Sequence, residues 1–405
     1  MQLVAYGAQD VYLTGNPQIT FFKVVYRRHT NFSTESIQQT LNGTVGFGNR
    51  VSCTVSRNGD LVSACLLEVN LPALGGTDSY MARVGERLIE EVEVEIGGQV
   101  IDRQYGEWMT IWTDLTNNQD KATLLNKLKG TRDQDDIDNE IFINTGSVPL
   151  QFWFCRNPGL ALPLIALQYH EVKININFRP ASSTKLGMHE NDKVTVWCDY
   201  IFLDTDERRR FAQVSHEYLI EQVQFSNKLT ATPGSNQVEL RFNHPVKELV
   251  WAVANSSKGD GATAMAAGSQ AGATATQPPA GGVHGGDVTV TDALLQLNGH
   301  DRFKRRSGPY FTQQQRYQYH SGSSGNGNIH VYSFALKPEE HQPSGTCNFS
   351  RIDNAVLNFT CPDSDGESNA DDENASVDAT GVSVYAVNYN VLRIMSGMGG
   401  LAYSN

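Results

Sequence analysis

Short runs in which apolar and polar residues alternate are the feature that most constrains how this chain folds. Residues 92–96 (VEVEI), 172–178 (VKININF), 194–197 (VTVW) and 382–385 (VSVY) all follow a period of two. Because successive side chains of a strand point to opposite faces, this period predicts strands with one buried and one wet face. No regular alternation of strands with long helices is seen, which disfavours a doubly wound parallel sheet. We therefore predict an all-β fold.

The strand-like segments also occur twice, in the same order. Five segments of the first half have counterparts in the second half, at an offset that stays near 185 to 200 residues. The pairs are 35–39 with 219–223, 49–69 with 236–253, 94–99 with 295–300, 172–178 with 355–359, and 194–197 with 382–385. Five collinear pairs indicate an internal duplication. Each half has room for about eight strands, which fits one jelly roll per half.

The duplication predicts the domain organisation. We expect two tandem antiparallel eight-stranded jelly-roll barrels, at 31–207 and 208–405, preceded by an N-terminal arm at 1–30. The join falls near 204–208, a charged stretch suited to a linker. A chain of 405 residues is long enough to bury more than one core.

Helices and biased loops are expected as insertions between strands. Residues 105–129 carry Trp108, Ile111, Trp112 and Leu115 near helical spacing, and Asn117-Asn118 should break this stretch in two. Residues 255–287 are rich in Ala, Gly, Ser and Thr, and residues 363–379 are acidic. Neither can bury much apolar surface, so both are predicted to be exposed, mobile surface loops.

The charge balance bears on partners and compartment. The chain has 44 acidic and 32 basic residues, a net charge of −12. An acidic surface repels phosphate, so direct contact with nucleic acid is not expected, and the basic clusters at 27–29, 208–210 and 304–306 are interpreted as solvated or interface charge. The N-terminal residues do not resemble a signal peptide, and no run of about 18 apolar residues occurs. We expect a soluble protein made in the cytosol.

Six cysteines are too few for a disulfide scaffold in a chain of this length. Cys53 and Cys65 flank the turn signal Asn58-Gly59. A simple hairpin about that turn leaves the two cysteines one residue out of register. Their pairing therefore stays open, and buried free thiols are the favoured interpretation.

Motifs for enzymatic chemistry are scarce. No phosphate-binding loop, zinc-binding helix or nucleophile elbow is present, and no cofactor or metal is predicted. Glu91, Glu93 and Glu95 share one strand face, where paired carboxylates could serve glycoside hydrolysis. A water-facing surface, or a rim that pairs with Lys or Arg of a neighbour, is the favoured interpretation. Residues 363–367 begin like a calcium loop but lack the later ligand positions.

Asparagine glycosylation is the one modification that the sequence suggests. Asn255 and Asn374 stand in Asn-x-Ser/Thr sequons within the predicted exposed loops. Without a signal peptide, secretory glycosylation is not expected. A virus with its own glycosyltransferases could still modify exposed asparagines.

Four long blocks of sequence resemble the major capsid proteins of nucleocytoplasmic large DNA viruses. The blocks are residues 7–32, 152–172, 343–353 and 388–402, so the resemblance runs over the whole chain. The first block contains the expected assembly segment, with Asn16, Pro17, Phe21, Phe22, Arg27, Arg28 and His29.

The resemblance implies a structural major capsid protein without enzymatic activity. It implies homotrimers with a pseudo-hexagonal outline that form an icosahedral shell over an internal membrane. Neighbouring capsomers and minor capsid proteins are the implied partners, and the virion is the implied location after assembly in the host cytoplasm. Two alternatives stay open: a minor capsid paralogue of the same fold, and a glycan-binding or glycan-processing β-sandwich protein.

Overall fold

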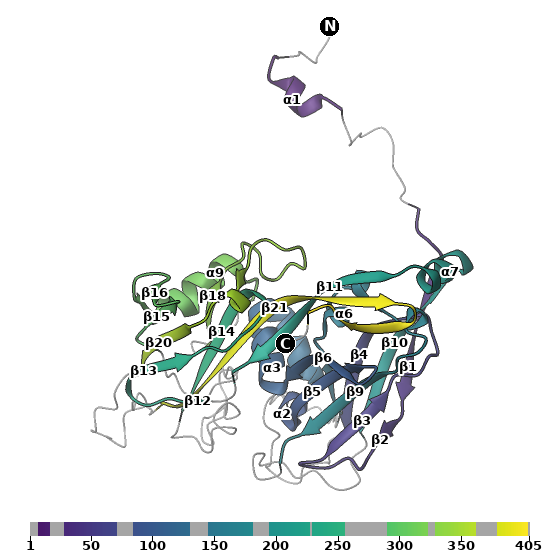
Figure 1. Cartoon of the computed structure of the whole chain (residues 1–405), viewed down its shortest axis with the longest axis horizontal. Coiled ribbons are helices and arrows are strands. Elements are labelled where there is room, and N and C mark those ends of the chain that lie inside the picture. The colour runs from purple at the N-terminus through teal and green to yellow at the C-terminus, as the bar shows by residue number, and fades with distance from the viewer. Residues whose placement is uncertain are drawn as a thin grey trace.

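The computed structural model describes residues 7–16, 28–70, 84–129, 145–180, 194–226, 229–255, 290–322, 329–361 and 379–403. Two antiparallel barrels lie side by side, and the N-terminal helix α1 (Asp10–Thr14) stands apart from both (Figure 1). Each barrel is built from two sheets packed face to face.

The first barrel is formed by residues that precede the helix α7 (Thr205–Gln213). One sheet has the order β1 (Phe32–Gln39), β10 (Val194–Leu203), β4 (Leu61–Asn70) and β7 (Thr145–Pro149), with β8 (Leu162–Pro163) beside β4. The other has the order β2 (Leu41–Asn42), β3 (Arg50–Thr54), β9 (Val172–Phe178), β5 (Ile89–Ile96) and β6 (Gln99–Tyr105).

The second barrel follows α7. One sheet has the order β11 (His216–Phe225), β21 (Ala379–Met395), β14 (Pro245–Asn255) and β18 (Ile329–Ser333), with β12 (Leu229–Thr230), β19 (Cys347–Asn348) and β22 (Met398–Leu401) at its margins. The other has the order β13 (Gly234–Glu239), β20 (Ala355–Cys361), β15 (Asp292–Leu297) and β16 (His300–Asp301), with β17 (Arg306–Ser307) beside β15.

The two barrels share one connectivity, which confirms the predicted double jelly roll. When each barrel's eight main strands are counted in chain order, one sheet reads first, eighth, third, sixth and the other second, seventh, fourth, fifth. The repeat extends to the register of paired strands. Val69 of β4 pairs with Val194 of β10, and the equivalent Val253 of β14 pairs with Val382 of β21.

Two predicted repeat pairs are aligned wrongly within their strands. Cys53 and Val238 pair with the equivalent residues Ile174 and Leu357, so the start of the pair 49–69 with 236–253 is two residues out. Trp197 pairs with Gln38 and its counterpart Tyr385 pairs with Phe225, so β1 and β11 correspond with a shift of three residues from the predicted alignment. A period-two pattern specifies a face of a strand but leaves shifts along the strand poorly determined.

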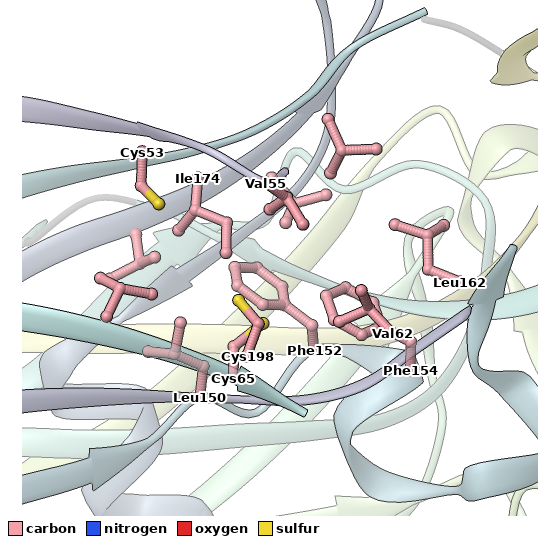
Figure 2. Close-up of a cluster of buried hydrophobic side chains, with 14 of the residues drawn as sticks. Cys53, Val55, Val62, Cys65, Leu150, Phe152, Phe154, Leu162, Ile174 and Cys198 are labelled. Atoms are coloured by element: carbon pink, nitrogen blue, oxygen red, sulfur yellow. The ribbon is translucent and has the colours of Figure 1, made fainter. Parts of the chain in front are cut away.

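The apolar residues of the alternating segments are buried in the cores of both barrels. Along β10 the side chains are alternately buried and partly exposed from Val194 to Tyr200. Phe152 and Phe154, from the segment after β7, fill the first barrel, with ring centroids 5.8 Å apart (Figure 2). The core of each barrel is therefore built from both of its sheets and closed by aromatic side chains.

The Asn58-Gly59 turn does not make a hairpin. It joins β3 and β4, which belong to opposite sheets of the first barrel. Cys53 and Cys65 are both free, and the sulfur of Cys65 instead lies 3.4 Å from that of Cys198 on the paired strand (Figure 2). The second predicted turn, Asn298-Gly299, does make a hairpin. It joins β15 and β16, which pair within one sheet, and its two residues have φ of 52° and 76°.

The predicted helical insertion is confirmed, including its break. α3 (Gly106–Thr116) ends at Asn117, whose backbone is extended, and α4 (Gln119–Leu128) follows. Shorter helical segments are α2 (Val84–Leu88), α6 (Trp153–Arg156), η1 (Pro158–Leu160), η2 (Leu164–Ala166), η4 (Tyr310–Gln314), α9 (Gln315–Tyr319) and η5 (Phe349–Arg351). The predicted join between the halves lies inside α7, and the first residue of one predicted loop, Asn255, pairs with the last residue of the other, Ala379. The rest of both predicted loops lies outside the described residues.

Candidate functional site: the seam between the barrels

The contact between the two barrels is the candidate functional site, because it determines how the two halves of the chain are held relative to one another. Helix α3 follows the last strand of one first-barrel sheet and lies between the barrels (Figure 1). Its residues Trp108, Ile111, Trp112 and Leu115 fall on one helical face, and all four are buried. The first barrel therefore offers an apolar helical ridge to the second.

The second barrel receives this ridge on the outer face of its β11–β21–β14–β18 sheet. Val250, Tyr385 and Val387 point away from their own barrel core and are nevertheless fully buried, because they pack with α3. The Trp108 and Tyr385 rings lie 5.2 Å apart, and Phe225 stacks on Tyr385 at 4.7 Å. The second barrel is thus completed by a helix of the first.

A buried charge cluster joins the barrels beside this apolar contact. Glu221 of β11 accepts a hydrogen bond from Arg156 of α6, at 3.0 Å, and forms an ion pair with Lys247 of β14, at 2.8 Å. Arg156 also lies over the Trp112 ring, 4.7 Å from its centroid. Burial acts to raise the pKa of Glu221, but His341, Lys247 and Arg156 outweigh it and lower that pKa to about 2. Removing one member would leave a buried charge unpaired.

Two sheet edges also meet at the seam, because β6 and β11 are both edge strands. The Gln222 side-chain amide donates to the Ile101 carbonyl, and the Val223 backbone N–H donates to Asp102 at 3.2 Å. Burial raises the pKa of Asp102 to about 6, although Gln104 and Val223 donate hydrogen bonds to it. Asp102 is the only acidic residue that lines the cleft at this edge, within the part of the chain that is described.

The far end of α3 is held by the segment after α9. Ser321 donates its hydroxyl to the Thr116 carbonyl at 2.9 Å, and the Gly322 N–H donates to the Leu115 carbonyl at 2.7 Å. His320 precedes these contacts, buried 3.0 Å from Glu248. Burial acts to lower the pKa of His320, but Glu248 and Glu339 outweigh it and raise that pKa to about 9.

The C-terminal strands fasten the second half onto the first. β21 extends from the second barrel across to the first (Figure 1), where Leu392 and Ile394 join the first barrel's core. The Tyr169 N–H donates to the Gly397 carbonyl at 3.0 Å, and a His170 ring nitrogen lies 3.0 Å from the Gly399 carbonyl. The seam thus combines an apolar ridge, a charge cluster and a strand from the opposite half.

The predicted assembly segment is only partly described. Asn16 is exposed with a φ of 52°, and Arg28 and His29 are exposed just before β1. A His29 ring nitrogen lies 2.9 Å from the Thr30 carbonyl, and its ring makes an edge contact with Phe32. Pro17, Phe21, Phe22 and Arg27 lie outside the described residues, as does Asn374. The backbone of Asn255 ends β14.

The three glutamates of β5 face outward from the first barrel, and Glu93 fits the second of the two predicted alternatives, since it pairs with arginines of neighbouring strands instead of facing water. It is 3% exposed and forms ion pairs with Arg50 at 2.7 Å and with Arg103. Glu91 and Glu95 accept hydrogen bonds from asparagines of β9. Neighbouring strands of the same chain therefore neutralise this face. Among the described residues, no group of three or more His, Cys, Asp or Glu is placed to hold a metal ion.

No helix among the described residues is long and apolar enough to cross a membrane.

Comparisons with known proteins agree with this architecture. The family model of the major capsid protein N-terminus matches residues 20–204, and that of the large eukaryotic DNA virus major capsid protein matches residues 207–400. The chain is 49% identical to the major capsid protein of Pyramimonas orientalis virus, over 100% of this chain and 99% of that one. It is 48% identical to that of Paramecium bursaria Chlorella virus 1, with the same coverage.

Solved structures show the same likeness. A quasi-atomic model of the PBCV-1 virus capsid matches with a TM-score of 0.79 at 42% identity, over 95% of this chain and 100% of that chain. The Faustovirus major capsid protein shares the fold, with a TM-score of 0.69 at 13% identity, over 96% and 94% of the two chains. Two jelly rolls in one chain, locked at a seam, define a double jelly-roll shell protein. The chain belongs to the large eukaryotic DNA virus major capsid protein family, and it is a structural component of the virion capsid.

Proposed function

We propose that three copies of this chain form a capsomer with a pseudo-hexagonal outline and that such capsomers tile an icosahedral shell. The observation that carries the proposal is the repeat of one strand order in two barrels. Two similar barrels in each of three copies present six near-equivalent sides, and hexagons tile a flat facet. The seam supports this role because it holds the two barrels of each copy at a single angle.

The N-terminal arm is proposed to join a capsomer to its neighbours or to minor capsid proteins, near an inner viral membrane. The exposed side chains of Val11 and Tyr12 on α1, at 64% and 89%, support this role. Large apolar side chains exposed on a segment that stands apart from the body are typical of an interaction site. Production and assembly in the host cytoplasm belong to the same proposal, as does glycosylation at Asn255 and Asn374.

A non-enzymatic role is proposed with it. The cleft between β6 and β11 offers one carboxylate, Asp102, among its described lining residues, whereas glycoside hydrolysis uses two facing carboxylates. The glutamates of β5 are bound to arginines and asparagines. These observations favour a shell protein over a glycan-processing one.

Mass measurement in solution, with electron microscopy of the purified full-length protein, tests the proposal. We expect a mass of three chains and particles of hexagonal outline. A chain that stays monomeric at every concentration tried, without hexagonal particles, would overturn the proposed capsomer.

A further inference from the structure

The outer sheet face that α3 covers in the second barrel has a counterpart in the first. Val250 and Tyr385 are cross-strand partners there, and both are fully buried. The equivalent partners in the first barrel are Leu66 and Trp197, which remain partly exposed. The same position in the duplicated fold is thus covered in one barrel and open in the other.

The edge of that face shows the same contrast. β11 lies against β6, and three of its residues are fully or nearly fully buried, Ile220, Glu221 and Val223. β1 holds the same place in the first barrel, but the five residues from Phe32 to Ser36 are all exposed. Phe32 is 58% exposed on the outer face. The first barrel therefore has an exposed edge strand and an exposed sheet face, whereas the equivalent edge and face of the second barrel are covered by β6 and α3.

The second barrel carries a counterpart of α3 whose outer side chains contact no other part of the described chain's two cores. Helical residues also stand between its fifth and sixth main strands, as η4 and α9. Positions 314, 317 and 318 are exposed and share the spacing of Trp108, Ile111 and Trp112. Tyr317 is 90% exposed. This helix continues the seam within the chain, because the residues after it bond to α3.

We propose that η4 and α9 of one copy pack on the outer face and edge of the β1–β10–β4 sheet of the next copy. The proposal rests on the proposed trimer and assigns its contact. Each barrel then contacts the next in the same sense, and a head-to-tail contact of this kind closes a ring. Charge supports a second copy as the occupant. The receiving face bears Glu68 and Asp199, and residues 302–306 beside η4 include one lysine and three arginines.

The two contacts differ in polarity. α3 presents two tryptophans, whereas the exposed stripe of η4 and α9 has two glutamines and a tyrosine. A contact between separately folded copies must stay soluble until assembly, so a polar surface with an aromatic centre suits it.

Two variants test the contact in the full-length chain. Leu66→Arg places a cation on the receiving face, opposite the basic side, and Tyr317→Glu places an anion opposite the acidic face. Each is expected to raise the concentration needed for trimers at least about tenfold while leaving the melting temperature of the monomer near wild type. Glu171→Lys, just before β9 in the opposite sheet of the first barrel, where the side chain is 67% exposed, is the control and should assemble normally. Normal trimers from both folded variants would overturn the assignment.

Mixing the two variants gives a sharper test. A Tyr317→Glu copy keeps an intact receiving face, and a Leu66→Arg copy keeps an intact helix. A head-to-tail contact between these faces predicts heterodimers of one copy each in native mass spectrometry. A mixture that stays monomeric overturns this pairing. If wild-type protein never forms trimers, the proposed capsomer fails instead, so the two failures are distinguishable.

Discussion

β1 and β11 occupy the same place in two copies of one fold, and they differ in what covers them. β11 is protected by β6, and its sheet is covered by α3, whereas β1 is exposed over most of its length. The second barrel therefore depends on the first for part of its buried surface. In return, Ile220 of β11 and Leu392 and Ile394 near the end of β21 pack into the core of the first barrel. We therefore expect the two barrels to fold as one cooperative unit and not as two independent domains.

The largest loss of stability is expected when the apolar ridge of α3 is removed, because the second barrel depends on it for buried surface. Trp108→Ala empties a fully buried site between α3 and Tyr385, so we expect the free energy of unfolding to fall by about 3–5 kcal/mol. The second barrel should unfold first, which calorimetry would show as a second transition. Leu124→Ala, 71% exposed on the next helix, should change stability by less than about 0.5 kcal/mol. A single unshifted transition for Trp108→Ala would contradict this account.

Breaking the charge cluster should cost slightly less. Glu221→Leu leaves Lys247 and Arg156 without their shared partner, and we expect a loss of about 3 kcal/mol in denaturant unfolding. Glu217→Ala is the matched control on the same strand, since its side chain is 59% exposed and pairs with the half-exposed Arg393. That change should cost less than about 1 kcal/mol. Equal losses in the two variants would show that burial of the cluster is unimportant.

The contact at the far end of α3 should be sensitive to alkaline pH. The pKa of His320 in the folded state, about 9, lies above its ordinary value of 6.5. Its stabilisation is therefore fully present below pH 6.5 and is lost as the pH rises through 9, by about 2–3 kcal/mol. His320→Gln should flatten the pH dependence of unfolding across this window. An unchanged slope in the variant would assign the pH dependence to other groups.

The smallest effect is expected where the two sheet edges meet. The folded-state pKa of Asp102, about 6, lies above 3.8, so wild-type stability should fall as the pH rises between these values. Asp102→Asn removes the buried charge. We expect it to stabilise the protein by about 1 kcal/mol at pH 8 and to have little effect at pH 4. Destabilisation at pH 8 would mean that the hydrogen bond from Val223 outweighs the cost of the buried charge.

Much of the fold could be predicted from the sequence because its signals are local. The alternation of apolar and polar residues in segments such as 172–178 specifies strands. A two-residue turn such as Asn298-Gly299 marks where one strand ends and the next begins. The duplicated order of these signals is enough for two jelly rolls. The break at Asn117 was visible for the same reason.

The seam could not be predicted, since its members are far apart in the chain. The helical spacing of Trp108, Ile111 and Trp112 indicates an apolar face but not the sheet that it covers. Arg156, Glu221 and Lys247 have no shared sequence pattern, and their pairing depends on how the barrels pack.

The sequence by itself determined two similar barrels, because strand patterns and turns act within a few residues. Only the tertiary structure decided which equivalent faces are covered. Covering a face depends on where an inserted helix lies after both barrels have packed, and no local pattern encodes that position. The duplicated sequence makes the barrels alike, and the tertiary contacts leave β11 largely covered and β1 largely exposed.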